Sequence, residues 1–145
     1  MISHFRKTSI KISFDTLVDQ MKSALDREGF VVSGETDFQQ QFQDRLNIHF
    51  RKHVILTVYI PVLVFEMLSI APFDGMILPC SVTMTERYPG EVEIIPVNPT
   101  ALLVMVTQDD SLQNLAEQMS RRLDLVIQSL ERESTNTPDI VTSWS

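Results

Sequence analysis

Residues 76–97 read MILPCSVTMTERYPGEVEIIPV, the clearest hairpin pattern in the chain. Apolar and polar residues alternate on either side of Tyr88-Pro89-Gly90, which is typical of a tight turn between two antiparallel strands. We expect strands over Met76–Arg87 and Glu91–Val97. This hairpin favours a mostly antiparallel sheet.

The residues before the hairpin change between strand-like and helix-like patterns. The expected strands are Thr8–Ser13, Phe30–Glu35 and His53–Tyr59, which alternate or are rich in β-branched residues. Helices are expected after the capping residues Ser13 and Asp37, and from Pro61 to about Ile70.

The strongest helical pattern follows the hairpin, from Ser111 to about Arg132, where apolar residues recur at helical spacing. Residues 102–106 are apolar and fit either a strand or a helical turn. The order of elements predicts one α+β domain over residues 1–133. We expect a two-layer sandwich whose mostly antiparallel sheet has helices packed on one face.

Composition excludes several classes of protein. The 145 residues carry 12 basic and 19 acidic side chains, a net charge of −7, and a single cysteine. The acidic balance argues against general binding to nucleic acid, and one cysteine cannot form an internal disulfide. No secretory signal follows the first residues, so we expect a cytoplasmic protein. The apolar stretch Val54–Pro79 contains prolines and acidic residues, which argues against a membrane span.

Basic residues form clusters near the N-terminus and just before the third expected strand. Arg6, Lys7 and Lys11 precede any acidic residue, and Arg51-Lys52-His53 is the only other basic cluster. The first group either pairs with an acidic surface or protects a strand edge. The second either holds an anion or is a solvated pair of cations.

Several short strings, in this order, resemble the bacterial and archaeal family known as domain of unknown function 302. The likeness covers about residues 8–132. It rests on Ser13-Phe14-Asp15, Glu28-Gly29-Phe30, Asn47-Ile48-His49-Phe50-Arg51, Ile55-Leu56, Leu78-Pro79-Cys80 and Asn98-Pro99. The resemblance implies a compact two-layer domain, similar in topology to half of the TATA-binding protein, often homodimeric and without an established activity.

The chain departs from the family pattern at two places. The strand before the helix at Pro61 commonly runs into cysteine-asparagine-proline, whereas this chain has Tyr59-Ile60-Pro61. The asparagine that usually follows the second cysteine is Ser81. Any family chemistry that needs two thiols would therefore be absent.

Cys80 is the first candidate for chemistry, because thiolates are nucleophiles and soft-metal ligands. On a strand it shares a face with Val82, where burial would make it an unreactive packing residue. The alternative is a thiol-dependent or small-ligand enzyme, with Cys80 in a pocket bordered by Tyr59, Arg51 and Glu66.

The other candidate side chains can also be explained by structural roles that involve no ligand or metal. Glu66 is the only carboxylate in an otherwise apolar helix and marks either a paired buried group or an exposed edge. His49 and His53 are four residues apart, but on an extended segment their Cα atoms would lie about 13 Å apart, too far to share one metal ion. We therefore expect polar surface histidines.

The sequence lacks a phosphate-binding glycine loop, a Ser-His-Asp signature, a zinc-type cysteine arrangement and an aromatic RNA-binding stripe. We expect a homodimeric binding or interaction module without catalysis, cofactor or metal, and without a nucleic-acid or membrane partner. A protein or a small molecule would be its partner. Dimerisation would use a sheet edge or the long C-terminal helix. Residues 134–145 form a tail whose Ile140, Val141 and Trp144 are candidates for packing on a neighbouring subunit.

Overall fold

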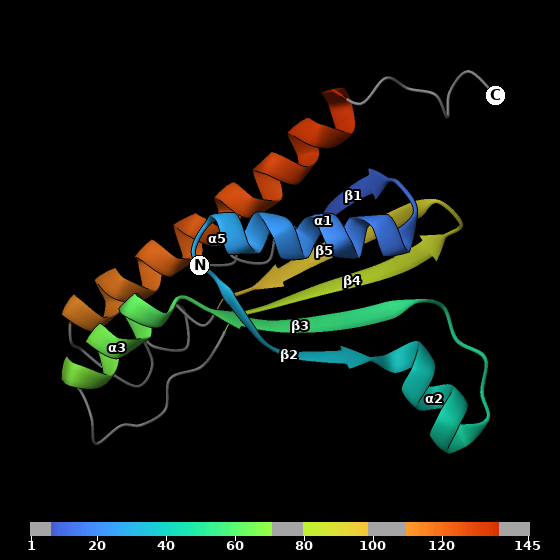
Figure 1. The fold of residues 1–145 in the computed structure, drawn as a ribbon, viewed down its shortest axis with the longest axis horizontal. Helices are drawn as coiled ribbons and strands as arrows, with labels where there is room; N and C mark the ends of the chain where they lie inside the picture. Colours follow the sequence, from blue (N-terminus) through green and yellow to red (C-terminus); the bar gives the residue numbers. More distant parts are fainter. Residues whose placement is uncertain (1–6, 71–79, 99–109, 137–145) are drawn as a thin grey trace.

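The computed structural model describes residues 7–70, 80–98 and 110–136. Residues 135 and 136 are described by their backbone alone. Five strands form one sheet in the order β1-β5-β4-β3-β2, and every neighbouring pair is antiparallel. The strands are β1 (Thr8–Lys11), β2 (Val31–Asp37), β3 (His53–Tyr59), β4 (Cys80–Tyr88) and β5 (Glu91–Val97). The predicted α+β class and antiparallel sheet are confirmed (Figure 1).

The hairpin predicted from the sequence is formed by β4 and β5. Met84 pairs with Ile94 in its middle, and Gly90 turns the chain with φ +79°, a conformation that glycine adopts at little cost. The strand expected from Met76 begins at Cys80 among the described residues, and residues 71–79 lie outside them. A register shift between Glu86 and Tyr88 bends β4 just before the turn.

Four helices are described, and each begins near the residue expected from the sequence. They are α1 (Phe14–Arg27), α2 (Phe38–Leu46), α3 (Pro61–Ile70) and α5 (Asp110–Asn136). Ser13 and Asp37 accept hydrogen bonds from the backbone N–H groups of Thr16 and Gln40, as helix-capping residues do. The ambiguous segment 102–106 lies outside the described residues.

One face of the sheet carries the hydrophobic core. Alternate residues of β3, β4 and β5 point to this face and are almost fully buried, while α1 and α5 lie across it (Figure 1). The apolar stripe of α5 supplies eight core residues: Leu112, Leu115, Ala116, Met119, Leu123, Val126, Ile127 and Leu130. The stripe is the one expected from the helical periodicity.

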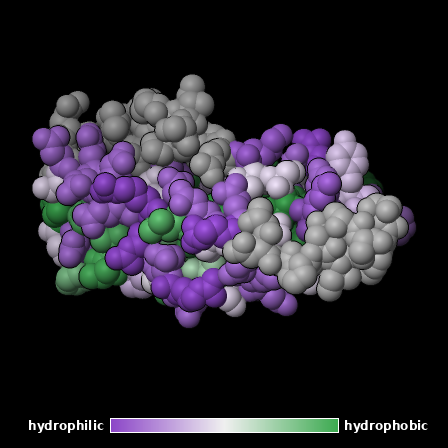
Figure 2. Space-filling view, turned by 90° about the horizontal axis from the view of Figure 1, so that it is seen from above, coloured by the Kyte–Doolittle hydropathy of each residue, from purple (hydrophilic) through white to green (hydrophobic). Residues whose placement is uncertain are grey.

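Figure 2 looks onto the helix-covered side of the molecule. Hydrophilic side chains cover much of it, and green apolar patches gather toward the end where α3 lies. On α3, Val62 and Phe65 are 59% and 71% exposed, whereas Leu63 and Met67 are buried. No helix within the described ranges is long and apolar enough to cross a bilayer.

The opposite face of the sheet has no described helix across its middle. Ile55, Ile95 and Val97 alternate with buried core residues, so their side chains point to it, and they are only half-buried. We call this the open face. The helix α2 packs on β3 at one end of it, through ring contacts made by Phe38, and therefore does not join the layer of α1 and α5.

The central contribution of α5 can be tested with two leucines of that helix. Leu123 is 2% exposed, whereas Leu125 is 47% exposed. We expect Leu123→Ala to lower the free energy of unfolding by about 2–5 kcal/mol, because it leaves a cavity in the core, and Leu125→Ala by less than about 1 kcal/mol. Urea unfolding of the two variants checks this, and equal losses would contradict the packing described.

Candidate functional site

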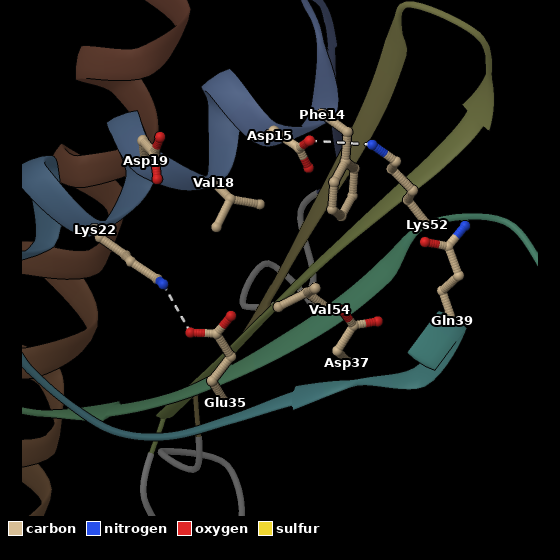
Figure 3. Close-up of a pocket in the computed structure, with 10 residues that line it drawn as sticks. All are labelled: Phe14, Asp15, Val18, Asp19, Lys22, Glu35, Asp37, Gln39, Lys52 and Val54. Atoms are coloured by element: carbon tan, nitrogen blue, oxygen red, sulfur yellow. Dashed lines mark hydrogen bonds and ion pairs between the residues drawn. The ribbon is translucent and has the colours of Figure 1, made fainter. Parts of the chain in front are cut away.

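A cleft of about 400 Å³ lies between α1 and the β2–β3 side of the sheet (Figure 3). Its lining comes from four elements and the segment before β3. The residues are Phe14, Asp15, Val18, Asp19, Lys22, Glu35, Asp37, Gln39, Lys52 and Val54. Six of them are charged, so the cleft is a place where a polar molecule can make several contacts at once.

Helical spacing places the charges of α1 on one side of this cleft. Asp15, Asp19 and Lys22 follow one another at intervals of four and three residues, so they lie along one stripe of the helix. Phe14 and Val18 are buried beside this stripe and form part of the apolar wall of the cleft. The amphipathic pattern that builds the core thus also sets the rim of the cleft.

A register shift brings carboxylates of β2 to the same cleft. The pairing of β2 with β3 slips between Val32 and Gly34, and beyond the slip Glu35 and Asp37 pair with Leu56 and Val54. Both partners are core residues, so the two carboxylates point to the helix-covered side of the sheet. Figure 3 shows them opposite α1.

Two ion pairs use part of this charge. The Lys22 ammonium lies 2.7 Å from Glu35 Oε1, and the Lys52 ammonium lies 3.1 Å from Asp15 Oδ2 (Figure 3). Each of these side chains is at least 39% exposed, so each pair contributes no more than about 1 kcal/mol. They link α1 to β2 and to the segment before β3 across the cleft.

Two carboxylates in the cleft have no cation of their own among the described residues. Asp19 forms no ion pair there, and Asp37 uses Oδ1 to accept the hydrogen bond from the backbone of Gln40. The lining carries four carboxylates and two lysines, so its net charge is −2. Such a site attracts a small cation with hydrogen-bond donors, such as an ammonium group.

Cys80 lies in the core. It is fully buried, pairs with Val58 across the sheet, and shares its face with Val82 and Met84. Burial raises the pKa of the Cys80 thiol to about 12. The thiolate, which is the nucleophile and metal ligand, is therefore scarce at neutral pH.

The other three side chains proposed to border Cys80 lie apart from it. Tyr59 is adjacent to Val58 on β3 and so points to the open face, away from Cys80. Arg51 precedes β3 at its other end and donates a 2.9 Å hydrogen bond from Nε to Thr85 Oγ1. Glu66 is exposed on α3. No described pocket contains two of these four residues.

His53 is placed differently from the surface position expected for it. Its ring lies 5.6 Å from Phe38 and 6.2 Å from Phe50, with an edge-to-face arrangement toward Phe38. Burial, with a smaller contribution from the charge of Arg51, lowers the pKa of His53. Its Nδ1 is buried without a hydrogen-bond partner. His49, by contrast, is exposed as expected, and no described group of three His, Cys, Asp or Glu residues is arranged to hold a metal ion.

The sequence did not indicate the cleft, because its residues are spread over residues 14–54 and resemble ordinary helix and strand surface. One available signal was the stripe Asp15, Asp19 and Lys22 beside buried positions of α1. The β2 register shift, which directs Glu35 into the cleft, has no sequence signature beyond Gly34. The tail residues Ile140, Val141 and Trp144 lie outside the described residues.

The burial of Cys80 predicts a silent thiol. With a pKa of about 12, roughly one thiol in ten thousand is ionised at pH 8. We expect no modification of the folded protein by a disulfide reagent at that pH over minutes, and one thiol per chain in denaturant. Rapid stoichiometric modification of the folded chain would place Cys80 at a reactive site instead.

Comparison with known proteins agrees with this architecture. The family model described as "Domain of unknown function DUF302" matches residues 5–130. A crystal structure of an uncharacterized conserved DUF302 protein from Bacillus stearothermophilus superposes with a TM-score of 0.73 at 22% identity, over 85% of this chain and 94% of that one. No curated protein matches the sequence. The chain therefore belongs to the family of the domain of unknown function DUF302.

Proposed function

We propose that this protein is a binding module without catalysis, and that its ligand is a small molecule with an ammonium group held in the cleft between α1 and β2. The observation that carries the proposal is the pair of carboxylates, Asp19 and Asp37, which face the cleft without a cation of their own among the described residues. The cleft volume of about 400 Å³ suits a small ligand.

The apolar wall of the cleft supports a ligand with a hydrocarbon part. Phe14, Val18 and Val54 line it below the charged rim, and all three are buried. A short alkyl diamine would place methylene groups against these side chains and its ammonium groups near Asp19 and Asp37. Both contacts are favourable, because the first removes apolar surface from water and the second pairs opposite charges.

The burial of Cys80 weighs against the thiol-dependent alternative. A thiol with a pKa of about 12 is a poor nucleophile at neutral pH, and Arg51, Tyr59 and Glu66 lie away from it. A binding role uses the features that the cleft does have, namely charge, shape and an apolar wall. A cytoplasmic location stays a prediction from the sequence.

Titration calorimetry with putrescine tests the cleft. We expect saturable binding that weakens as salt is added, because the attraction is electrostatic. Asp19→Asn and Asp37→Asn should each weaken it by about twofold to fivefold, and asparagine at 37 preserves the helix cap. The matched control is Asp26→Asn, an exposed carboxylate of the same helix outside the cleft. No saturable binding, or an equal loss in the control, would overturn the proposal.

We also propose that the module is a homodimer, with a second copy covering the apolar middle of the open face. Ile55, Ile95 and Val97 project from that face and keep part of their apolar surface in water.

A second copy is the occupant that fits this face. A twofold axis through the middle of the sheet would set the isoleucine and valine side chains of one chain on those of the other, so that apolar surface meets apolar surface. The surfaces named from the sequence are less suitable. One edge strand, β1, has four residues, and the other, β2, is bent by the register shift between Val32 and Gly34. The helix α5 exposes one large apolar side chain among its described residues, Leu125.

Sedimentation velocity tests the dimer directly. We expect a species of twice the 16.6 kDa chain mass, and we expect Ile95→Lys to return it to the monomer, because the substitution would bury an unpaired charge. Leu125→Lys on α5 is the control and should leave the dimer intact. A monomer at every concentration, or dissociation caused by the control alone, would contradict an interface on the open face.

A further inference from the structure

A row of polar side chains crosses one end of the open face. The strand registers pair His53 with Thr85, Thr85 with Glu93, and Glu93 with Ser9, so these four residues lie side by side on β3, β4, β5 and β1. We call them the polar row. The row lies at the end next to α2, whereas Tyr59 and Val97 lie toward the other end of the same strands.

Two arginines are anchored to neighbouring members of this row. Arg51 donates from Nε to Thr85 Oγ1 at 2.9 Å, and Arg87 donates from Nε to Glu93 Oε1 at 3.0 Å. Thr85 and Glu93 are direct partners on adjacent strands, with Cα atoms about 5 Å apart. The two guanidinium groups are therefore held at adjacent positions.

Each arginine keeps hydrogen-bond donors for another group. Both use Nε within the chain, and neither forms a hydrogen bond through its terminal nitrogens to another described residue. Arg51 is further fixed by stacking at 4.4 Å from the centre of the Phe50 ring. A guanidinium held at Nε presents its remaining N–H groups in a fixed fork, the geometry that pairs with a carboxylate or phosphate.

The charge around the row is positive in a chain that is acidic overall. Arg87 and Lys7 pair with one carboxylate, that of Glu93, whose Oε2 lies 3.6 Å from the Lys7 ammonium, and Arg51 is bonded to Thr85 on the neighbouring strand. Burial would raise the pKa of Glu93, but its hydrogen bond to Arg87 and the charges of Arg87 and Lys7 lower it overall. Of the two carboxylates on this face of β5, Glu91 lies opposite Lys11 and Glu93 pairs with Arg87 and Lys7, so Arg51 is left without a carboxylate partner among the described residues.

We propose that this end of the open face binds an oxyanion, through the terminal nitrogens of Arg51 and Arg87 and the ammonium of Lys7. The ligand group is a carboxylate or a phosphate of a small molecule, since both offer oxygens to two guanidinium forks. The buried Thr85 hydroxyl and the Glu93 carboxylate serve as positioning groups for the arginines. The site is separate from the cleft and does not depend on the ammonium ligand proposed for it.

The sequence contained half of this arrangement. Lys7 belongs to the basic N-terminal group and Arg51 to the cluster Arg51-Lys52-His53, which were separate features of the chain. Pairing of β1 with β5 and of β3 with β4 brings both groups to one end of one face. Lys52 does not contribute to this site, because its side chain pairs with Asp15 in the cleft.

Nuclear magnetic resonance titration tests the site with inorganic phosphate and with succinate, each at constant ionic strength set with sodium chloride. We expect saturable shifts of the Arg51 and Arg87 Nε–H signals and of the Thr85 amide. Comparing the two titrations distinguishes a phosphate from a carboxylate preference. Shifts that are not saturable, or that sodium chloride alone reproduces, would overturn the proposal.

Variants separate a site from general attraction by charge. Arg51→Gln and Arg87→Gln should each weaken binding by about tenfold, the effect of losing one charged hydrogen bond. The control Arg45→Gln removes an exposed arginine of α2 that donates from Nε to Gln41 and should have no effect. Equal weakening in the control would contradict the site.

One further variant should increase affinity, which a misfolded chain cannot do. Glu93→Gln removes the carboxylate that competes for Arg87 and Lys7, so we expect phosphate and succinate to bind several-fold more tightly. An unchanged or weaker affinity would show that the cations are committed to the chain's own carboxylate and would overturn the proposal.

Discussion

The structure depends on the burial of one face of a five-stranded antiparallel sheet beneath α1 and α5. Val58, Val82 and Ile94 lie on this face with no exposed surface, and the stripe of α5 closes over it. Because successive residues of a strand point to opposite faces, committing one set of residues to the core commits the other set to the open face. The positions of Cys80 and Tyr59 follow from this constraint alone.

The same constraint separates the charges of the molecule. Carboxylates on α1 and β2 gather in the cleft on the helix-covered side, where the lining carries a net charge of −2. Lys7 before β1, Arg87 of β4 and Arg51 before β3 gather around the polar row on the open face. The net charge of −7 therefore combines two surfaces of opposite sign, and each surface suits a different ligand group.

Much of the fold could be predicted from the sequence, because local signals and the global packing agree. Tyr88-Pro89-Gly90 marks the hairpin turn, Ser13 caps α1, and the stripe of α5 repeats at helical spacing. The buried position of Cys80 followed from alternation along β4. Membership of the DUF302 family, expected from short strings along the chain, is confirmed by the match over residues 5–130.

The candidate sites could not be predicted, because they depend on contacts between distant segments. The cleft needs the register shift that directs Glu35 toward Lys22, and the polar row needs the pairing of β1, β5, β4 and β3. His53 was expected at the surface, yet its ring packs against Phe38, the first residue of α2, and against Phe50, in the segment before β3. The grouping of Arg51, Tyr59 and Glu66 around Cys80 failed for the same reason, since strand alternation and length keep them apart.

The proposed dimer requires that the described residues leave the middle of the open face uncovered and that a second copy covers it. The most direct test places a single cysteine at Thr83, in the middle of that face, in a Cys80→Ala background, and measures its rate of modification by a maleimide over a range of protein concentrations. We expect rapid modification of the cysteine at position 83 in dilute solution and protection of this cysteine as the protein concentration rises. Protection at every dilution would show that the chain covers this face itself, and equal reactivity at every concentration would show that no second copy does.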